Sequence, residues 1–247
     1  MPYQYADVRY ELLRPAQVKA RREEAPIAYI VAGSLEWHGF QNPLGTDSLK
    51  AHAICCEAAR KYGGVVLPPF YQGLLGTNNW GAPGWEGFTL SFNEESMFET
   101  AMLGIVRALV YGKWQVIVGV TGHDVESQRN AMQRAIEGGT AGTNATGFGM
   151  MEGEMHQLTS DIPIYMDHAG AWETSCMMSA YPECVYLDDL RAHLLSTGDQ
   201  FDIHGPEGIG GFNPLTHASP ELGAKIINAM ADLIGQRARG LLGDNIR

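Results

Sequence analysis

The stretch APIAYIVAGSLEWHGFQNPLGTDS, residues 25 to 48, joins a short apolar run to a turn-rich segment that carries ionisable side chains. The first part, residues 25–33, is nearly continuous in apolar residues and ends in glycine. Such runs are typical of strands that are buried on both faces, as in parallel sheets. Runs of the same character, each of which predicts a strand, occupy residues 63–70, 114–122, 162–170 and 183–190.

Helical patterns separate several of these runs. Helices are predicted over residues 48–61, 93–112, 125–137 and 219–242. In the second of them, Phe98, Met102, Ile105 and Leu109 recur at spacings that line one face of a helix. Strands that alternate with helices predict an α/β fold, with a mostly parallel central sheet and helices on both faces. No domain boundary is visible, so we expect one domain over residues 1–247.

Composition narrows the class of protein. The chain has 247 residues, 45% of them hydrophobic, and a formal net charge of −11, which fits a folded core. No basic stripe is present, which disfavours nucleic acid and anionic membranes as partners. We see no secretory signal and no window of about 18 uncharged apolar residues. The cysteines lack metal-knuckle spacing, so we expect free thiols in a reducing cytoplasm.

Two segments allow more than one interpretation. Residues 138–149 are rich in Gly and Thr and lack charge, which fits either a flexible linker or a mobile loop near a pocket. In TNNWGAPGWEG, residues 77–87, the side chains of Trp80 and Trp85 could pack under a loop. Equally, together with Asn78 and Asn79, they could line a pocket for a small polar ring, and we carry Asn79 and Trp80 as candidate substrate contacts.

Polar side chains follow three of the predicted strands. Glu36 and His38 follow the first run, His123 follows the run that begins at residue 114, and Asp167 and His168 end the run that begins at residue 162. In open α/β sheets, ligands bind beyond the carboxyl ends of the strands. If these strands are parallel neighbours, the three sets of side chains open on one edge of the sheet.

Asp47 completes a plausible ligand set. It comes after the turn NPLGT, and Gly45 would let that turn fold back toward Glu36 and His38. Carboxylates together with imidazoles suit Zn²⁺, Mn²⁺ or Fe²⁺. Taken singly, Asp47 would be a helix N-cap, Glu36 an exposed loop acid, and each histidine a hydrogen-bonded turn residue. Their combination, with His123 from an adjacent strand, predicts a metal site.

Three motifs extend this interpretation. The segments GSLEWHGFQNPLGTD (33–47), VTGHD (120–124) and DHAGAWETS (167–175) together resemble the signature motifs of the creatininase (creatinine amidohydrolase) family. The resemblance implies an α/β fold and a two-metal hydrolase, usually a hexamer. By position, it implies that Glu36 and His123 hold one divalent ion, that His38 holds the second, and that Asp47 bridges both. His168 falls where the family places a catalytic histidine, and Asp167 and Trp172 match part of that histidine's surroundings.

One expected ligand is missing. Creatininase itself has a glutamate ligand two residues after the strand-end histidine, where this chain has Val125. Two divalent ions carry about four positive charges, and Glu36, Asp47 and a bridging hydroxide reduce the charge of the site to about +1. A third carboxylate would neutralise this remaining charge, and a neutral site is favoured where it is partly desolvated. The candidates are Asp124, Glu126 and Glu173. We prefer Glu173, because it approaches from a different direction than His123, and place Asp124 second.

The predicted activity follows from these roles. We expect a dinuclear-metal-dependent hydrolase in which a metal-bridged hydroxide attacks the carbonyl of a small polar, cyclic substrate and cleaves a C–N amide bond. His168 would move a proton to the leaving group, oriented by Asp167, and Asn79, Trp80 and Trp172 would contact the substrate. Two alternatives remain: C–C hydrolysis that opens an inositol-derived cyclic diketone, and a non-catalytic protein with a structural metal. A sugar- or nucleotide-binding module is disfavoured, because no G-x-G-x-x-G turn is present.

Overall fold

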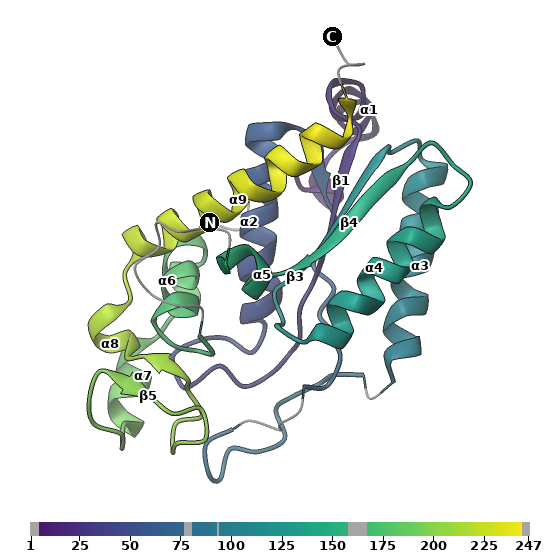
Figure 1. Cartoon of the computed structure of the whole chain (residues 1–247). Helices are drawn as coiled ribbons and strands as arrows, with labels where there is room; N and C mark the ends of the chain where they lie inside the picture. The colour runs from purple at the N-terminus through teal and green to yellow at the C-terminus, as the bar shows by residue number, and fades with distance from the viewer. Residues whose placement is uncertain (1–4, 77–80, 93, 158–166, 244–247) are drawn as a thin grey trace.

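The computed structural model describes residues 5–76, 81–92, 94–157 and 167–243, and its centre is a parallel sheet (Figure 1). Four strands pair in the order β2-β1-β3-β4, all parallel. Their bounds are β1 Ile27–Ala32, β2 Val65–Val66, β3 Val116–Thr121 and β4 Thr146–Met151. The register pairs Ala32 at the end of β1 with Thr121 at the end of β3. The predicted α/β class with a parallel sheet is confirmed.

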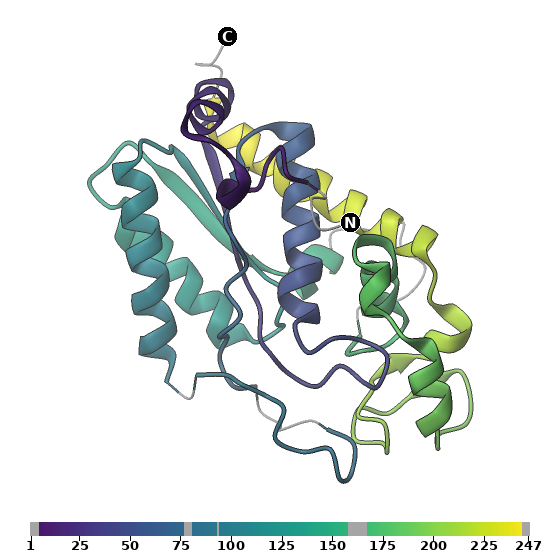
Figure 2. The same cartoon turned by 180° about the vertical axis from the view of Figure 1, so that it is seen from behind.

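Helices cover both faces of this sheet (Figures 1 and 2). Their bounds are α1 Pro15–Glu24, α2 Thr46–Tyr62, α3 Glu95–Tyr111, α4 Glu126–Thr140, α5 Glu152–Gln157, α6 Ala171–Ala180, α7 Leu187–His193, α8 Pro214–His217 and α9 Pro220–Leu241. A hairpin of β5 Gln200–Phe201 and β6 Gly211–Phe212 lies apart from the sheet. Every side chain of β1 is buried. Tyr29 packs into a core with α2, α6 and α9, and Ile30 packs into a core with α3 and α4.

The predicted helices form close to their expected bounds. In α3 the buried residues are Phe98, Met102, Val106 and Leu109, so Val106 replaces Ile105 on the buried face. The longest, α9, has Pro220 in its first turn and Ser219 as its N-cap, where the hydroxyl accepts a hydrogen bond from Leu222 N. None of the helices in the described ranges is long and apolar enough to cross a membrane.

The predicted strand at residues 183–190 is wrong. That segment covers the end of a 3-10 turn, Pro182–Cys184, and the beginning of α7. Proline in the first turn favours helical geometry, and Asp188 and Asp189 lie at the N-terminal end of α7, where carboxylates interact favourably with the helix dipole. Leu190 is the one residue of α7 that is buried, so the apolar run marks one helix face. Of another predicted strand, residues 162–170, the part at 162–166 lies outside the described residues, and His168 and Ala169 form isolated bridges with Gly210.

The loop predicted at residues 138–149 is also wrong for most of its length. Its first residues end α4, and residues from Thr146 onward form β4, which lies at one edge of the sheet. A Cβ at Gly147 would collide with the Ile117 carbonyl oxygen of β3, and one at Gly149 would press on the backbone of Gln133 in α4. These glycines therefore permit close packing of a strand, which composition alone does not distinguish from a flexible linker.

Candidate metal centre

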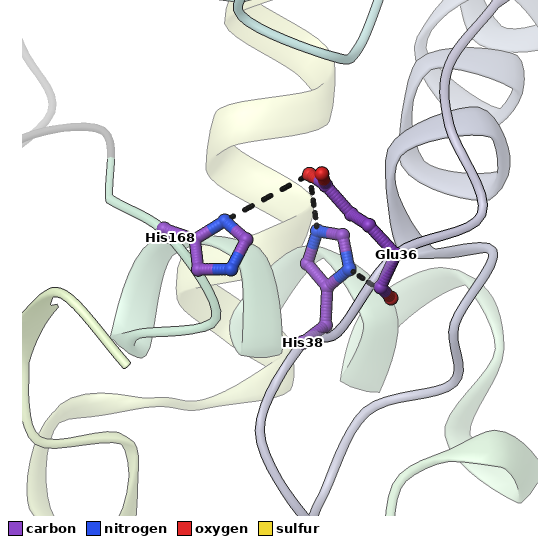
Figure 3. Close-up of side chains that lie close together, drawn as sticks. All are labelled: Glu36, His38 and His168. Atoms are coloured by element: carbon purple, nitrogen blue, oxygen red, sulfur yellow. Dashed lines mark hydrogen bonds and ion pairs between the residues drawn. The ribbon is translucent and has the colours of Figure 1, made fainter. Parts of the chain in front are cut away.

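The segment that follows β1 turns back on itself and carries the first two candidate ligands. Glu36 N donates to the Leu44 carbonyl at 3.0 Å, which closes the turn, and Gly39 adopts a positive φ of 71° within it. His38 is fully buried, and its Nδ1 lies 3.1 Å from the Glu36 carbonyl oxygen. That hydrogen bond assigns the ring proton to Nδ1, so Nε2 is left to face the cluster (Figure 3).

Asp47 lies in the first turn of α2, between the two buried histidines. Its Oδ1 lies 3.1 Å from His38 Nε2, and its Oδ2 lies 3.1 Å from His123 Nδ1. The alternative that Asp47 serves as a helix N-cap does not hold, because Gly45 occupies that position. One carboxylate thus presents a different oxygen to each imidazole.

His123 follows β3 and reaches the same point from the adjacent strand. Its Nε2 lies 3.0 Å from the Leu74 carbonyl oxygen, which accepts a hydrogen bond from the ring N–H and fixes the tautomer. Nδ1 then faces two carboxylates, with Glu36 Oε1 and Asp47 Oδ2 each at 3.1 Å. The sequence-based expectation that strand ends bring Glu36, His38 and His123 together agrees with these positions.

Of the three candidates for an additional carboxylate, Glu173 lies in the cluster. It is buried in the first turn of α6, and its Oε2 accepts from Ala169 N at 2.6 Å and lies 3.4 Å from His38 Nε2. Asp124 is exposed and accepts from Gly153 N at 3.2 Å, and Glu126 is exposed on α4. Neither belongs to a group of potential ligand atoms among the described residues.

His168 lies at the more open side of the cluster. Its ring centroid is 4.8 Å from that of His38, and its Nδ1 is 4.0 Å from Glu36 Oε1 (Figure 3). The side chain is 19% exposed, against 0% for His38. Burial lowers the pKa of His168, and the neighbouring His38 lowers it further, although Glu173 and Glu36 oppose this. The ring is therefore neutral at pH 7 and able to accept a proton.

Asp167 is half-buried next to His168 and binds the beginning of α6. Its Oδ2 accepts from Trp172 N at 2.8 Å and its Oδ1 accepts from Glu173 N at 3.2 Å. These are helix N-terminal amides, which favour a carboxylate partner. Asp167 thereby fixes the first turn of α6, the turn from which Glu173 projects.

The ligand atoms form overlapping groups that suit divalent ions. Glu36, Asp47 and His123 form one group, and His38, Asp47 and Glu173 form another; within each, the candidate ligand atoms lie within 4.8 Å of one another. A third group joins Glu36 and His38 with His168. Nitrogen and oxygen donors in this mixture fit Zn²⁺ or Mn²⁺. Asp47 is common to the first two groups, so the residues present fit two neighbouring ions.

Without an ion, the carboxylates act on the histidines instead. Burial lowers the pKa of His38, but Asp47 and Glu173 outweigh it and raise that pKa to about 9. Burial likewise lowers the pKa of His123, but Asp47 and Glu36 raise it to about 10. At pH 7 with no metal bound, both rings are therefore protonated on both nitrogens and carry a positive charge.

Sequence reasoning missed two charged residues beside the cluster, Lys50 and Glu152. Lys50 lies one turn after Asp47 on α2, and its side chain is 1% exposed. Its ammonium forms an ion pair with Glu173, lies 2.8 Å from Glu152 Oε2, and lies 3.6 Å from Asp47 Oδ1. Burial lowers the pKa of Lys50, but these carboxylates raise it well above its ordinary value. The sequence does contain a signal for Lys50, because it lies three residues after a candidate ligand in a predicted helix and therefore on the same helix face.

The predicted substrate contacts lie in different surroundings. Asn79 and Trp80 are outside the described residues. Trp172 is fully buried, and its indole N–H donates to Glu152 Oε1 at 2.9 Å. Its ring has no surface open to a small molecule in this arrangement, and it links Glu152 to α6. A direct contact between Trp172 and substrate stays a prediction.

Comparison with known proteins places these residues in a family context. The family model for creatininase, described as creatinine amidohydrolase, matches residues 11–237. A creatinine amidohydrolase from Pseudomonas putida is 23% identical over 190 residues, covering 72% of this chain and 73% of that protein. A mycofactocin precursor peptide peptidase from Mycolicibacterium smegmatis is 26% identical over 229 residues, covering 89% of this chain and 74% of that protein.

Solved structures share the fold. A mutant creatininase complexed with creatine aligns with a TM-score of 0.74 at 20% identity, covering 96% of this chain and 99% of that chain. A structure described as a manganese creatininase aligns with a TM-score of 0.72 at 20% identity, covering 95% of this chain and 98% of that chain. At this level of identity the likeness concerns the fold, and the arrangement of the site depends on the residues described above.

Proposed function

The chain belongs to the creatininase family, a family of metal-dependent hydrolases, and from this premise we propose that it hydrolyses a C–N amide bond of a small polar substrate with two divalent ions. The observation that carries the proposal is the position of Asp47, which directs one carboxylate oxygen toward His38 and the other toward His123. Membership in an enzyme family also favours catalysis over the alternative of a purely structural metal site.

The proposed ligands divide into two positions. We call the group of Glu36, Asp47 and His123 the first position, and the group of His38, Asp47 and Glu173 the second position. The far nitrogen of each histidine is hydrogen-bonded to a backbone carbonyl, of Glu36 for His38 and of Leu74 for His123. Such outer contacts hold imidazoles in one tautomer and orientation, as expected for metal ligands.

The protein would supply proton transfer and orientation around these ions. Bound divalent ions lower the pKa of water and polarise a carbonyl oxygen. His168 is neutral at pH 7 and directs Nδ1 toward Glu36, so it can accept a proton there and pass it to the leaving amide nitrogen. Asp167 acts indirectly, because it fixes the first turn of α6 and with it the Ala169 amide that holds Glu173.

Amide chemistry is what the named relatives have in common. One is named for creatinine, a cyclic amide-type substrate, and the other for a precursor peptide. Both reactions require attack on a carbonyl carbon and departure of nitrogen, for which His168 is suitably placed. The substrate proposed for this chain is therefore a small amide, cyclic or peptidic. Opening of an inositol-derived diketone at a C–C bond would use the same carbonyl attack and belongs in the same screen.

The test is a substrate screen of metal-loaded protein against cyclic amides including creatinine, formamides, short peptides and keto-inositols. We expect turnover of at least one amide, abolished by chelation and restored by Mn²⁺ or Zn²⁺. Asp47→Asn is the matched variant, because it keeps the shape of the side chain and removes the shared negative charge. It should lose at least one ion and most of the turnover. A metal-free preparation with full activity, or an Asp47→Asn variant with both ions and the wild-type rate, would refute the proposal.

The proposed enzyme is a homo-oligomer, a hexamer if it assembles as the family resemblance implies. Support comes from the segment 81–92, where Trp85 is 43% exposed, Phe88 is 41% exposed and Leu90 is 60% exposed. Several large apolar side chains exposed on one segment are typical of an interaction surface. Light scattering on the purified protein should give about six times the mass of the chain, and a monomeric mass would contradict assembly.

A further inference from the structure

We propose that Lys50 makes the two metal positions unequal, so that the second position binds its ion more weakly than the first. The inference rests on the proposed function, because it takes the two positions defined there as given. Lys50 is not itself a ligand candidate, since an ammonium has no acceptor atom. Its effect would come from placing a fixed positive charge against one of two otherwise similar sets of donors.

The contacts of Lys50 distinguish the two positions. Its ammonium forms an ion pair with Glu173, which belongs to the second position alone. It also lies 3.6 Å from Asp47 Oδ1. That oxygen faces His38, whereas Oδ2 of the same carboxylate faces His123. No ion pair joins Lys50 to Glu36 or His123 among the described residues. The positive charge therefore lies beside the second position.

The position of Lys50 is fixed by its surroundings. The side chain is 1% exposed, and Asp47 and Lys50 are three residues apart on α2, which places them on the same face of the helix. Glu152 Oε2 lies 2.8 Å from the ammonium, and Glu152 Oε1 in turn accepts from the Trp172 indole at 2.9 Å. The charge cannot swing into solvent, so it acts on any cation that enters the second position.

Counting charges gives the direction of the effect. Glu36, Asp47, Glu152 and Glu173 bring four negative charges and Lys50 brings one positive charge, which leaves a net charge of −3 when the histidines are neutral. One divalent ion at the first position reduces this to −1. The second ion carries a charge of +2, and the remaining charge of −1 balances only half of it. Without Lys50 the remaining charge would be −2, which matches the second ion.

A purely structural role for Lys50 predicts the opposite sign. If the ammonium served only to hold Glu173 in place for the metal, removing it would weaken the second position. If its charge opposes the second ion, Lys50→Met should strengthen that position. Neutralising its partner through Glu152→Gln should weaken the position further, because the positive charge of Lys50 is then less compensated.

The experiment is a calorimetric titration of chelator-stripped protein with Mn²⁺, with bound metal measured independently by mass spectrometry. For the wild type we expect two classes of site whose dissociation constants differ by about tenfold or more. Lys50→Met should shrink that ratio, and Glu152→Gln should enlarge it. Lys61→Met, which removes a lysine of the same helix that pairs with Asp232 on the surface, should leave both constants unchanged.

The outcomes separate this inference from the proposed function. Two ions bound with equal affinity by the wild type, or a weaker second site in Lys50→Met, would overturn the inference while leaving a dinuclear enzyme intact. A wild type that binds no ion would overturn both. Circular dichroism checks that each variant is folded. If Lys50→Met does not fold, the direction of change in Glu152→Gln decides, because that variant keeps the side-chain shape.

Discussion

Gly122 packs directly against the backbone carbonyl of Asp47, so closely that a Cβ atom at residue 122 would collide with it. Gly122 N also donates to the Ala32 carbonyl at 2.9 Å. The end of β3 and the first turn of α2 are therefore in backbone contact immediately before His123. This contact explains how His123 Nδ1 comes to lie 3.1 Å from Asp47 Oδ2 although the two residues are far apart in sequence.

Gly122→Ala should consequently damage both stability and metal binding. Forcing a methyl group into a packed contact typically costs about 1–3 kcal/mol. The expected displacement of α2 from β3 would separate Asp47 from His123 and weaken the first position more than the second. Urea denaturation and Mn²⁺ titration measure the two effects. Gly104→Ala is the control, because a Cβ there meets nothing within 4 Å and alanine favours the helix. Equal behaviour of the two variants would contradict the packing argument.

Metal binding should release protons and strengthen as the pH rises. With no ion bound, the pKa of His38 is about 9 and that of His123 about 10, so both rings are protonated at pH 7. A metal ion must displace those protons, up to about two for two histidine ligands. The apparent affinity should therefore increase from pH 6 toward pH 9 and level off above the two pKa values. Calorimetry at pH 7 in buffers of different ionisation enthalpy counts the released protons directly. A count of zero would show that metal binding displaces no protons from these rings.

His168→Ala should lower kcat by about 10²–10⁴-fold while both ions stay bound, because it removes proton transfer and leaves the ligands in place. The pKa of His168 is held below its ordinary value. Activity that depends on the neutral ring should therefore persist at mildly acidic pH and fall only as the pH passes below that lowered pKa. His193→Ala is the control, since that exposed ring stacks on Phe40 outside the cluster. A His168→Ala variant with a normal rate would remove this residue from the proposed mechanism.

Trp172→Phe should act on stability. The substitution keeps a buried ring but removes the donor to Glu152 Oε1, and an unsatisfied buried acceptor costs about 1–3 kcal/mol. Chemical denaturation measures the loss, and steady-state kinetics on the substrate found in the screen measures KM. An unchanged stability together with a large rise in KM would instead favour the direct substrate contact predicted from the sequence.

The parts of the site that could be predicted are those that follow from strand ends. Glu36, His38 and His123 come directly after buried apolar runs, and parallel strands bring their carboxyl ends to one edge of the sheet. The sequence favours Glu173 as the additional carboxylate because of its direction of approach, and Glu173 lies beside His38 in the structure. Predicting these residues requires only the order of strands and helices along the chain.

The parts that could not be predicted depend on tertiary packing. Glu152 follows β4, a strand whose glycine-rich sequence resembles that of a loop. Its glycines instead pack closely against Ile117 and α4. The role of Lys50 cannot be predicted from the sequence, because helical periodicity gives the helix face on which a side chain lies but not which residues pack against that face. The segment 183–190 misled for a related reason, since a short apolar run is compatible with a strand or with one buried helix face.

In the proposed site, one carboxylate, that of Asp47, is shared by two ions. An anomalous difference map from crystals of the Mn²⁺-loaded protein would locate both ions relative to this carboxylate. We predict two peaks about 3.5–4 Å apart, one beside each oxygen of Asp47, as in other two-metal hydrolytic sites. A single peak, or two peaks of which only one adjoins Asp47, would contradict the account.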